Sequence, residues 1–484
     1  MSTGLVLSWR EGVTAEATAA GTLVVRGPGG QVCLGGVAPV LLEAFRRFDP
    51  PGESEDRLAE LVRQAGNGSL VRWYYYLERL LGRGQVCHSV VCDGRRLATL
   101  EPVSSSFVAR PGSAAPGRRY VLSRFAYLRC REGEAVLESP LAHARITLKD
   151  CGAAAVVAGL AGPVTVEELR GRVVGLPADA VGGLVTLLLR ADMVREAAGN
   201  GAEQSAASRV WEFHDLLFHA RSRLGRFDSP AGATCRLAEE LPPPSALKPD
   251  LSGESQDLHR PNLAHLEKDG PPLTRVLERR ASCRDFDASH PITDRQLGEF
   301  LFRVARVRDR WHAEVATRAG PVRMDFTSRP YPAGGSLYEL ELYPVVNRCS
   351  QVSPGMYHYD PMRHRLTRLC GRDGGWRELL RDAAGSAGAV EDDLQVLLVL
   401  AARFPRVAWK YESIAYSLTL KHVGVLFQTM YLVATAMGLG ACAVGCGDSD
   451  RFARAVGTDY CAETSVGEFL LGSRSWADSD SDRT

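Results

Sequence analysis

The chain has 484 residues and a mass of 52.5 kDa. This is about three times the length of an ordinary domain, so we expect two or three domains. Hydrophobic residues make up 45% and charged residues 24%, a balance that excludes a largely disordered chain. With 58 Lys and Arg against 57 Asp and Glu, the formal net charge is +1, which favours neither nucleic acid nor an anionic membrane as a general partner.

The 12 cysteines are scattered, and they contain no CxxC pair. The closest pairs, Cys442/Cys446 and Cys87/Cys92, lack the spacing of a structural zinc site, so we predict no metal. The N-terminal residues do not form a basic segment followed by an apolar one, and no signal peptide is expected. Scattered thiols without a secretion signal indicate a cytoplasmic protein with reduced cysteines.

One apolar segment, from Val423 to Ala436, invites a membrane interpretation. It is shorter than the roughly 20 apolar residues that a bilayer span needs, and it contains Gln428. We therefore predict no membrane partner, and a helix that is buried on all sides in a large core.

The first part of the chain alternates short strand-like runs with helical patterns. The helical pattern ends with Leu70–Gly84, and two β-rich pieces follow, Gln85–Cys92 and Arg96–Leu100. Asp93-Gly94 between these pieces is a hairpin signal. Strands, three helices and a hairpin are typical of a winged helix-turn-helix, which we assign to residues 1–115.

A similar order of elements returns after residue 116. Strand patterns come first, a helix follows Thr147, and another begins after Thr165, its expected N-cap. Helix Ala178–Arg190 closes the unit. We therefore predict a second winged-helix unit over residues 116–200.

The composition divides the rest of the chain, after residue 200, into three parts. Residues 201–272 are rich in proline and are predicted to be a linker with a short helix over 211–226. Residues 273–476 form the domain that carries the chemical motifs, and the polar residues 477–484 are expected to be a disordered tail.

The first motif of that domain places Arg280, Ser282 and Arg284 at alternate positions. In an extended stretch these side chains project to one side. Two guanidinium groups and a hydroxyl suit a phosphate, because Arg presents a planar fork of donors. Taken alone, however, the motif is more often an ordinary solvated surface.

Three further motifs follow. Pro332, Ala333, Gly334, Gly335 and Ser336 form a turn in which the glycines let the backbone approach a flat ligand. The pair Lys410-Tyr411 precedes the apolar helix. Ala443, Val444 and Gly445 end a strand that follows Met437-Gly438-Leu439-Gly440. A structural turn, an exposed Lys beside a core Tyr, and a helix C-cap are the alternatives.

In this order and spacing, the motifs resemble the FMN-dependent nitroreductase superfamily. More narrowly, YPAGGSLYELELY, GMYHYDP at 355–361 and Lys410-Tyr411 resemble SagB-type dehydrogenases, which oxidise peptide thiazolines and oxazolines to thiazoles and oxazoles. The resemblance implies an α+β fold, with an antiparallel or mixed sheet flanked by helices, and a homodimer that binds FMN.

The resemblance also implies roles for individual residues. Arg280, Ser282 and Arg284 would hold the FMN phosphate, and Pro332 to Ser336 would cover the flavin from the partner subunit. Ala443, Val444 and Gly445 would line the isoalloxazine, and Gln428 matches the usual glutamine of the long helix.

The sequence departs from the family pattern at three places. Ala333 replaces the usual serine, Lys421-His422-Val423-Gly424 replaces a Gly-His, and Thr429 replaces an asparagine. We expect these departures to affect flavin affinity or helix packing more than the type of reaction.

Oxidation of an azoline removes a proton and, in effect, a hydride, which the flavin accepts. We predict that Lys410 or Tyr411 supplies the base, through a stabilised phenolate or a lysine of lowered pKa. Neighbours on a strand point to opposite faces, so we expect that both need not reach the substrate.

Two other functions remain open from the residues. One is an FMN reductase of nitroaromatics or quinones that uses NAD(P)H, although such an enzyme does not need the long N-terminal extension. The other is a winged-helix DNA-binding redox sensor. The aromatic helix from Leu70 suits capture of a leader peptide by strand addition better than DNA. The expected partners are an azoline-containing precursor peptide and the cyclodehydratase of the same pathway.

Overall fold

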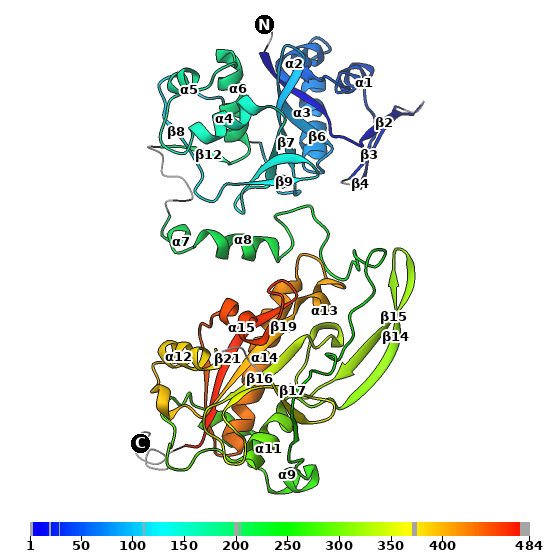
Figure 1. Cartoon of the computed structure of the whole chain (residues 1–484). Helices are drawn as coiled ribbons and strands as arrows, with labels where there is room; N and C mark the ends of the chain where they lie inside the picture. The colour runs from blue at the N-terminus through cyan, green and yellow to red at the C-terminus, as the bar shows by residue number, and fades with distance from the viewer. Residues whose placement is uncertain are drawn as a thin grey trace. The chain divides into compact units, whose positions relative to one another are not determined.

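The computed structural model describes residues 3–18, 21–28, 30–109, 112–197, 203, 205–369 and 375–474. The predicted tail at 477–484 therefore lies outside the described residues. Contacts divide the chain into two units, residues 1–229 and 230–484 (Figure 1).

The first unit is built on a seven-stranded sheet of order β5-β1-β6-β7-β11-β10-β9. Strand β7 pairs with β11, for example Leu100 with Ile146, so the two predicted winged-helix segments share one sheet. A separate three-stranded sheet, β2-β3-β4, and a two-stranded sheet, β12-β8, complete the strands. The helices α4, α5 and α6 lie together against the second half of the unit (Figure 1).

The elements of this unit are β1 (Thr3–Trp9), β2 (Thr14–Ala17), β3 (Leu23–Gly27), β4 (Gly30–Leu34), α1 (Pro39–Arg46), β5 (Glu53–Ser54), α2 (Glu55–Arg63), α3 (Asn67–Leu81), β6 (Val86–Cys92), β7 (Arg95–Pro102), β8 (Tyr120–Leu122), β9 (Tyr127–Arg131), β10 (Glu134–Glu138), β11 (Ala144–Leu148), α4 (Cys151–Gly159), α5 (Val166–Arg172), α6 (Ala178–Arg190), β12 (Val194–Glu196), α7 (Ala206–Arg209) and α8 (Phe213–Arg221).

Local signals in the sequence account for several of these boundaries. Asp93 and Gly94 both have positive φ, as a tight hairpin turn between β6 and β7 requires. Thr165 caps α5 in a capping box: its hydroxyl oxygen accepts from the Glu168 backbone N–H, and the Glu168 carboxylate accepts from the Thr165 backbone N–H. The predicted hairpin turn and the predicted N-cap are both confirmed.

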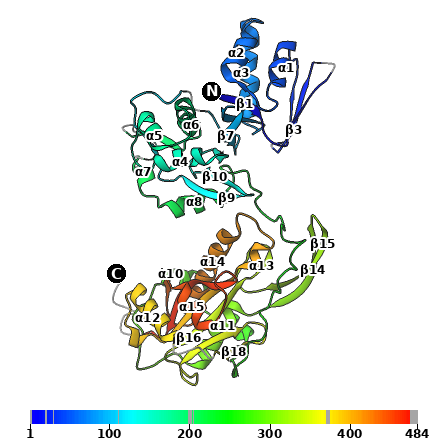
Figure 2. The ribbon, with the colours of Figure 1, turned by 45° about the horizontal axis from the view of Figure 1, so that its top comes forward.

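The second unit has a seven-stranded sheet of order β13-β18-β17-β16-β19-β21-β20, and its neighbouring strands are antiparallel. One face packs against α11 and α14, through residues such as Phe300 and Leu426. The other face packs against α12 and α15, through Leu380 and Phe452 (Figures 1 and 2). The predicted α+β fold, a sheet flanked by helices, is confirmed.

The elements of this unit are β13 (Ser255–Asp257), α9 (Leu263–Asp269), α10 (Leu273–Arg279), α11 (Asp294–Ala305), β14 (Asp309–Thr317), β15 (Gly320–Ser328), η2 (Gly334–Ser336), β16 (Leu340–Val346), β17 (Gly355–Asp360), β18 (Arg365–Arg368), α12 (Trp376–Ala387), η4 (Glu391–Asp393), β19 (Val396–Arg403), α13 (Phe404–Ala408), α14 (Ala415–Ala436), β20 (Gly440–Val444), α15 (Ser449–Val456) and β21 (Glu463–Gly472).

The prediction that the apolar helix is buried on all sides is wrong for this chain. Helix α14 buries Val423, Leu426 and Met430, but Gly424 and Gln428 are exposed. The apolar run is therefore only one part of a longer helix with a solvent-facing stripe. Among the described residues, no helix combines the length and the apolar character that crossing a bilayer requires.

Candidate functional site

The predicted site residues gather at two places along α14. His422 lies in the first part of this 22-residue helix, and Tyr431 lies near its end. At 1.5 Å of rise per residue, about 13 Å of helix separates them. The glycine-rich turn and Lys410-Tyr411 belong to the His422 end, whereas the predicted phosphate-binding residues belong to the Tyr431 end.

At the His422 end, the turn between β15 and β16 is held by a buried chain of hydrogen bonds. The backbone N–H of Gly334 donates to His422 Nε2 at 2.7 Å. His422 Nδ1 lies 2.7 Å from Glu339 Oε1, and the Glu339 side chain is fully buried. Gly335 has a φ of +61°, a left-handed conformation that favours glycine. The turn is thus fixed both by its backbone conformation and by His422.

Lys410 and Tyr411 converge on this turn. A Cβ atom built on Gly335 would lie 2.7 Å from the Tyr411 hydroxyl and 3.1 Å from Lys410 Nζ. The ammonium and the hydroxyl therefore approach the same point of the Gly335 backbone, and any side chain at that position would collide with the pair. Gly335 itself is exposed, whereas Lys410 and Tyr411 are half-buried.

The prediction that Lys410 and Tyr411 point to opposite faces of a strand is wrong. They follow α13 in a turn, in which both backbone N–H groups donate to Val407 O. Helical turns do not impose the alternation of a strand, so neighbouring side chains can reach one place. Both residues remain available to one substrate.

The surroundings of Tyr411 do not favour a phenolate. Burial raises the pKa of Tyr411 above its ordinary value of 10.0, and the nearby Cys235 raises it further. The stabilised phenolate that we considered from the sequence therefore has no support in these surroundings. Lys410 forms no ion pair with a carboxylate within the described part of the chain, and its Nζ lies 5.7 Å from the Phe326 ring centroid.

At the Tyr431 end, two of the three predicted phosphate-binding residues meet one tyrosine. The Ser282 hydroxyl is 2.9 Å from the Tyr431 hydroxyl, and the Arg280 guanidinium lies 5.3 Å from the Tyr431 ring centroid. The backbone N–H of Cys283, the residue between Ser282 and Arg284, donates to Ala441 O at 2.8 Å. The predicted projection of Arg280 and Ser282 to one side agrees with these contacts.

The same tyrosine links this stretch to the end of β20. The backbone N–H of Ala443 donates to the Tyr431 hydroxyl at 2.7 Å. Val444 is the last residue of β20 and is buried, and Gly445 follows as an exposed residue with open space around its Cα. The Tyr431 hydroxyl therefore links Ala443 to Ser282, although the sequence separates these residues widely.

The chemistry of this donor set fits the phosphate of a flavin. Arg280 and Arg284 form no ion pair with a carboxylate within the described ranges, so both guanidinium groups are free to bind an anion. Arg280 is half-buried, whereas Ser282 and Arg284 are exposed. The Arg280 guanidinium and the Ser282 hydroxyl, which meet at Tyr431, are suited to charge-assisted hydrogen bonds with phosphate oxygens.

The remaining predicted residues lie between or beside these clusters. Gln428 is exposed on α14, one turn before Tyr431. Pro332 is exposed at the start of the glycine-rich turn, and Ala333 and Ser336 are half-buried in it. Ser336 has a φ of +55°, so the turn has two successive left-handed residues.

Three residues that organise these clusters were not predicted as site residues. Tyr431 joins Ser282 to Ala443, and no local motif marks it. His422 was noted only as part of a departure from the family pattern, and Glu339 only as part of a motif. A buried glutamate and histidine near a glycine-rich turn were the only available signal, because their pairing depends on the packing of α14.

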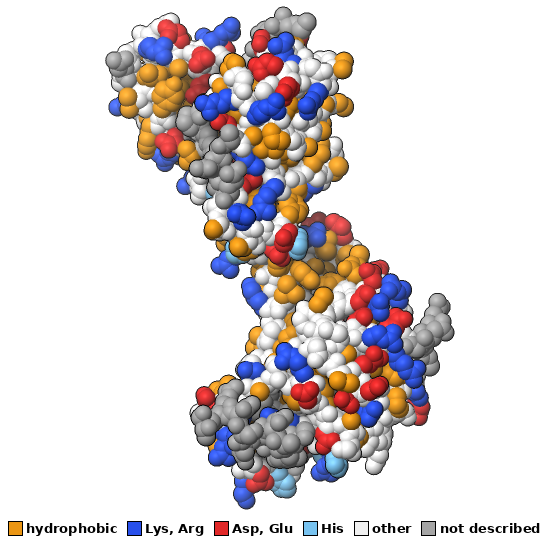
Figure 3. Space-filling model, turned by 90° about the vertical axis from the view of Figure 1, so that its left-hand side faces the viewer, with side chains coloured by type: hydrophobic (Ala, Val, Ile, Leu, Met, Phe, Trp, Pro, Cys, Tyr) orange, Lys and Arg blue, Asp and Glu red, His pale blue; other side chains and the backbone are white. Residues whose placement is uncertain are grey.

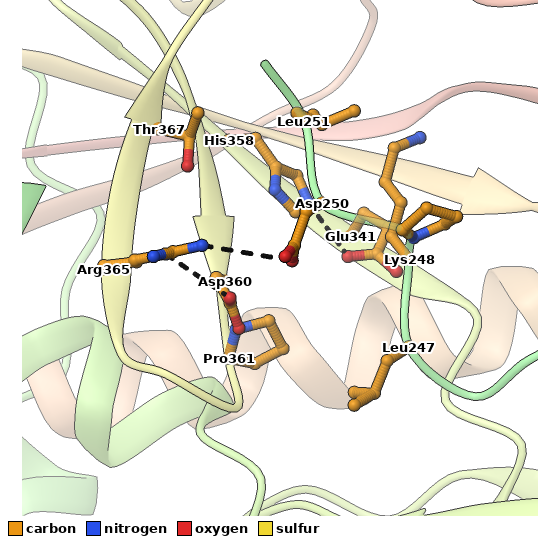
Figure 4. Close-up of a pocket in the computed structure, with 11 residues that line it drawn as sticks. Leu247, Lys248, Asp250, Leu251, Glu341, His358, Asp360, Pro361, Arg365 and Thr367 are labelled. Carbon is orange, nitrogen blue, oxygen red and sulfur yellow. Dashed lines mark hydrogen bonds and ion pairs between the residues drawn. The ribbon is translucent and has the colours of Figure 1, made fainter. Parts of the chain in front are cut away.

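A separate small cavity lies on the other side of β16 from α14, and it holds none of the predicted site residues (Figure 4). His358 Nε2 is 3.1 Å from Glu341 Oε2 there. Burial alone would raise the pKa of Glu341, but His358, Arg329 and Arg403 lower it to about 2. The cavity volume is about 20 Å³, room for little more than a water molecule.

The surface carries basic and acidic side chains intermixed, with no large field of one sign on the face seen in Figure 3. In the part of the chain that the structure describes, no group of three His, Cys, Asp or Glu side chains is placed to hold a metal ion.

Three family models match successive parts of the chain. The helix-turn-helix domain of the cyanobactin oxidase ThcOx matches residues 1–109, and the cyanobactin oxidase ThcOx model matches residues 120–228. The nitroreductase family matches residues 277–472, the region that contains both ends of α14. Residues 277–472 are therefore similar to the nitroreductase family. Together with the two N-terminal matches and the similarity to McbC, this supports the predicted resemblance to SagB-type dehydrogenases of the nitroreductase superfamily.

Individual relatives match shorter stretches. The predicted nitroreductase MJ1384 of Methanocaldococcus jannaschii is 27% identical over 193 residues, which are 40% of this chain and 85% of that protein. The microcin B17-processing protein McbC of Escherichia coli is 29% identical over 117 residues, 23% of this chain and 42% of McbC. Among solved structures, the E. coli microcin synthetase McbBCD complex with truncated pro-MccB17 has a TM-score of 0.33 at 20% identity, covering 54% of this chain and 91% of the matched chain.

Proposed function

We propose that this oxidoreductase is an FMN-dependent dehydrogenase that oxidises thiazolines or oxazolines in a precursor peptide to thiazoles or oxazoles. The observation that carries the proposal is the convergence of Lys410 Nζ and the Tyr411 hydroxyl on the Gly335 backbone. A reductase that passes a nicotinamide hydride to a small acceptor does not need a protein base, whereas aromatisation of an azoline does. The similarity to the cyanobactin oxidase models supports the same choice.

The chain's own residues divide the task between them. Arg280, Ser282 and Arg284 would hold the phosphate of FMN, which when bound supplies the hydride acceptor. Lys410 would take the acidic Cα proton of the azoline ring. Tyr411 keeps its proton, because burial raises its pKa, and its hydroxyl is therefore a hydrogen-bond donor that can orient the ring.

The experiment uses the full-length protein reconstituted with FMN and a synthetic azoline-bearing peptide. We expect mass spectrometry to show the loss of two hydrogen atoms per ring, together with reoxidation of the flavin by oxygen. A nitroaromatic with NAD(P)H is the parallel substrate. Reduction of the nitroaromatic without any oxidation of the azoline would overturn the proposal in favour of a reductase.

We propose that the protein is a homodimer joined through the exposed stripe of α14. Tyr416, Leu420, Gly424 and Gln428 recur every four residues on one face, and each is exposed. An apolar helix with such a face is expected to be covered. Leu420→Asp should lower the mass measured by light scattering to that of one chain. Val390→Asp, at a residue 60% exposed elsewhere in the same unit, is the control.

We propose that the first winged-helix segment binds the unmodified precursor peptide. Strand β4 is an edge strand of its sheet, and α3 beside it exposes Val71 and Tyr75 by 72% and 58%. The Tyr76 hydroxyl donates to Gly35 O at 2.8 Å and so ties α3 to the end of β4. An extended peptide can add to such an edge through main-chain hydrogen bonds.

The strand of the second winged-helix segment that corresponds in order to β4 is not an edge strand. This strand, β11, is already paired with β7. We therefore expect Tyr75→Ala to weaken binding of a fluorescent precursor peptide, and Tyr460→Ala, at an exposed residue of the other unit, to leave it unchanged. The enzyme that supplies the azoline must be a cyclodehydratase, since an azoline forms from Cys, Ser or Thr by loss of water.

A further inference from the structure

Both ring nitrogens of His422 are engaged, and the identity of one donor fixes the tautomer. The group that faces Nε2 is the backbone N–H of Gly334, which can only donate. Nε2 must therefore present its lone pair. Nδ1 then carries the proton of the neutral ring, and it donates this proton to Glu339 at 2.7 Å.

This arrangement removes His422 from direct chemistry. The side chain is 6% exposed and the Glu339 side chain is fully buried, so neither reaches a substrate. With both nitrogens bonded, His422 cannot take a proton from a ring without losing the turn. Its position matters instead because Gly334 precedes Gly335, against which the Lys410 ammonium and Tyr411 hydroxyl rest.

Space around the turn is tight on the same side. A Cβ atom on Gly334 would lie 3.2 Å from His422 Nε2 and 3.6 Å from Leu418 Cδ2. A side chain at position 334 would therefore crowd His422, whereas glycine lets the Gly334 N–H approach Nε2 closely. The hydrogen bond from the Gly334 N–H to His422 Nε2 sets the distance of Gly335 from Lys410 and Tyr411.

We propose that Glu339 and His422 are a positioning pair, with His422 in the neutral Nδ1–H tautomer, that holds the Gly334-Gly335 backbone in register with Lys410 and Tyr411. Glu339 orients the imidazole, and the imidazole orients the turn. The pair acts on the reaction only through the turn. This inference rests on the proposed function for its effect on catalysis, but not for its effect on the structure of the turn.

Three variants test the proposal by activity. His422→Leu leaves the Gly334 N–H without an acceptor, and His422→Gln places an oxygen acceptor near the position of Nε2. We expect His422→Leu to lower kcat for azoline oxidation by about 5- to 150-fold, the range for an unsatisfied buried donor, with KM for the peptide unchanged. His422→Gln should restore most of kcat. Glu339→Gln should have an intermediate effect.

The matched control is His364→Leu. His364 is also a buried histidine of the same unit with both nitrogens bonded, to the Tyr359 hydroxyl at 2.8 Å and to His259 O at 2.9 Å. It does not contact the turn, so its replacement should lower thermal stability without a change in kcat of the remaining folded protein. Equal kcat losses in the two leucine variants would show a general structural effect and overturn the proposal.

Two spectroscopic measurements do not depend on any activity. Nitrogen-15 NMR of the histidine side chains should show His422 as the neutral Nδ1–H tautomer, and 3-fluorotyrosine at position 411 should change its fluorine chemical shift in His422→Leu but not in His364→Leu. An Nε2–H tautomer or an unmoved fluorine signal would overturn the proposal. If the wild-type protein oxidises no azoline while both signals behave as expected, the proposed function fails and the positioning pair stands.

Discussion

The two ends of α14 differ in whether their polar side chains already have partners. At the His422 end, a chain of hydrogen bonds runs from the buried Glu339 through His422 to the Gly334 backbone, and Glu339 Oε2 is buried without a partner among the described residues. At the Tyr431 end, Arg280 and Arg284 are not paired with carboxylates among the described residues, and Ser282 and Gly445 are exposed. The donors at the His422 end are therefore hydrogen-bonded before any ligand binds, whereas the guanidinium groups at the Tyr431 end are free to bind one.

This difference indicates a division of labour along one helix. Groups that are already hydrogen-bonded to one another do not have to reorganise when the substrate binds. Such an arrangement suits residues that must hold a proton acceptor in place. Free guanidinium groups are costly to bury unless an anion joins them, which suits residues whose partner is a phosphate. The same helix can therefore contact residues that position a proton acceptor at one end and residues that bind a phosphate at the other.

Removal of the reactive groups at the His422 end should have the largest effect. We expect Lys410→Ala to lower the rate of azoline oxidation by about 10²- to 10⁴-fold, the usual value of general-base assistance, while FMN stays bound. Tyr411→Phe removes a donor that orients the ring and should lower the rate by less, also with FMN bound. Because both groups meet at Gly335, the double variant should lose less than the product of the two single losses. Single-turnover kinetics by mass spectrometry measures this. Wild-type rates in both variants would leave the pair with a structural role only.

Removal of a cation at the Tyr431 end should come next. Arg280→Ala deletes a charge-assisted contact worth about 1.5–3 kcal/mol, so the Kd for FMN should rise about 10- to 150-fold. Fluorescence titration of the apoprotein with FMN gives the value. Arg279→Ala is the matched control, because Arg279 is the exposed last residue of α10 directly before Arg280. An equal weakening in both variants would indicate only a general loss of positive charge.

The smallest effect should come from the hydroxyl that links residues at the Tyr431 end. Tyr431→Phe removes the partner of Ser282 and of the Ala443 N–H but keeps the ring under Arg280. A neutral hydrogen bond is worth about 0.5–1.5 kcal/mol, so FMN affinity should fall only about 2- to 12-fold, with no change in the rate of proton removal. Isothermal titration with FMN and the single-turnover rate at saturation separate the two quantities. A large fall in rate would mean that the two ends are coupled through α14.

The sequence by itself determined the features that depend on a few neighbouring residues. Asp93-Gly94 makes a hairpin turn and Thr165 caps a helix because the backbone geometry of each is decided within four residues. The alternation of Arg280 and Ser282 likewise placed two side chains on one side. The ordered motifs were also sufficient for the superfamily and for the α+β fold.

The tertiary structure alone decided which motifs meet. Gly334 and His422 are 88 positions apart in the chain, and Ser282 and Tyr431 are 149 apart. No local pattern specifies such pairs, because they depend on how α14 packs against the sheet. The same packing exposes Gly424 and Gln428 on a helix that its composition predicted to be buried, and it turns Lys410 and Tyr411 toward one glycine. Composition records how apolar a segment is, whereas its neighbours in space decide which of its faces they cover.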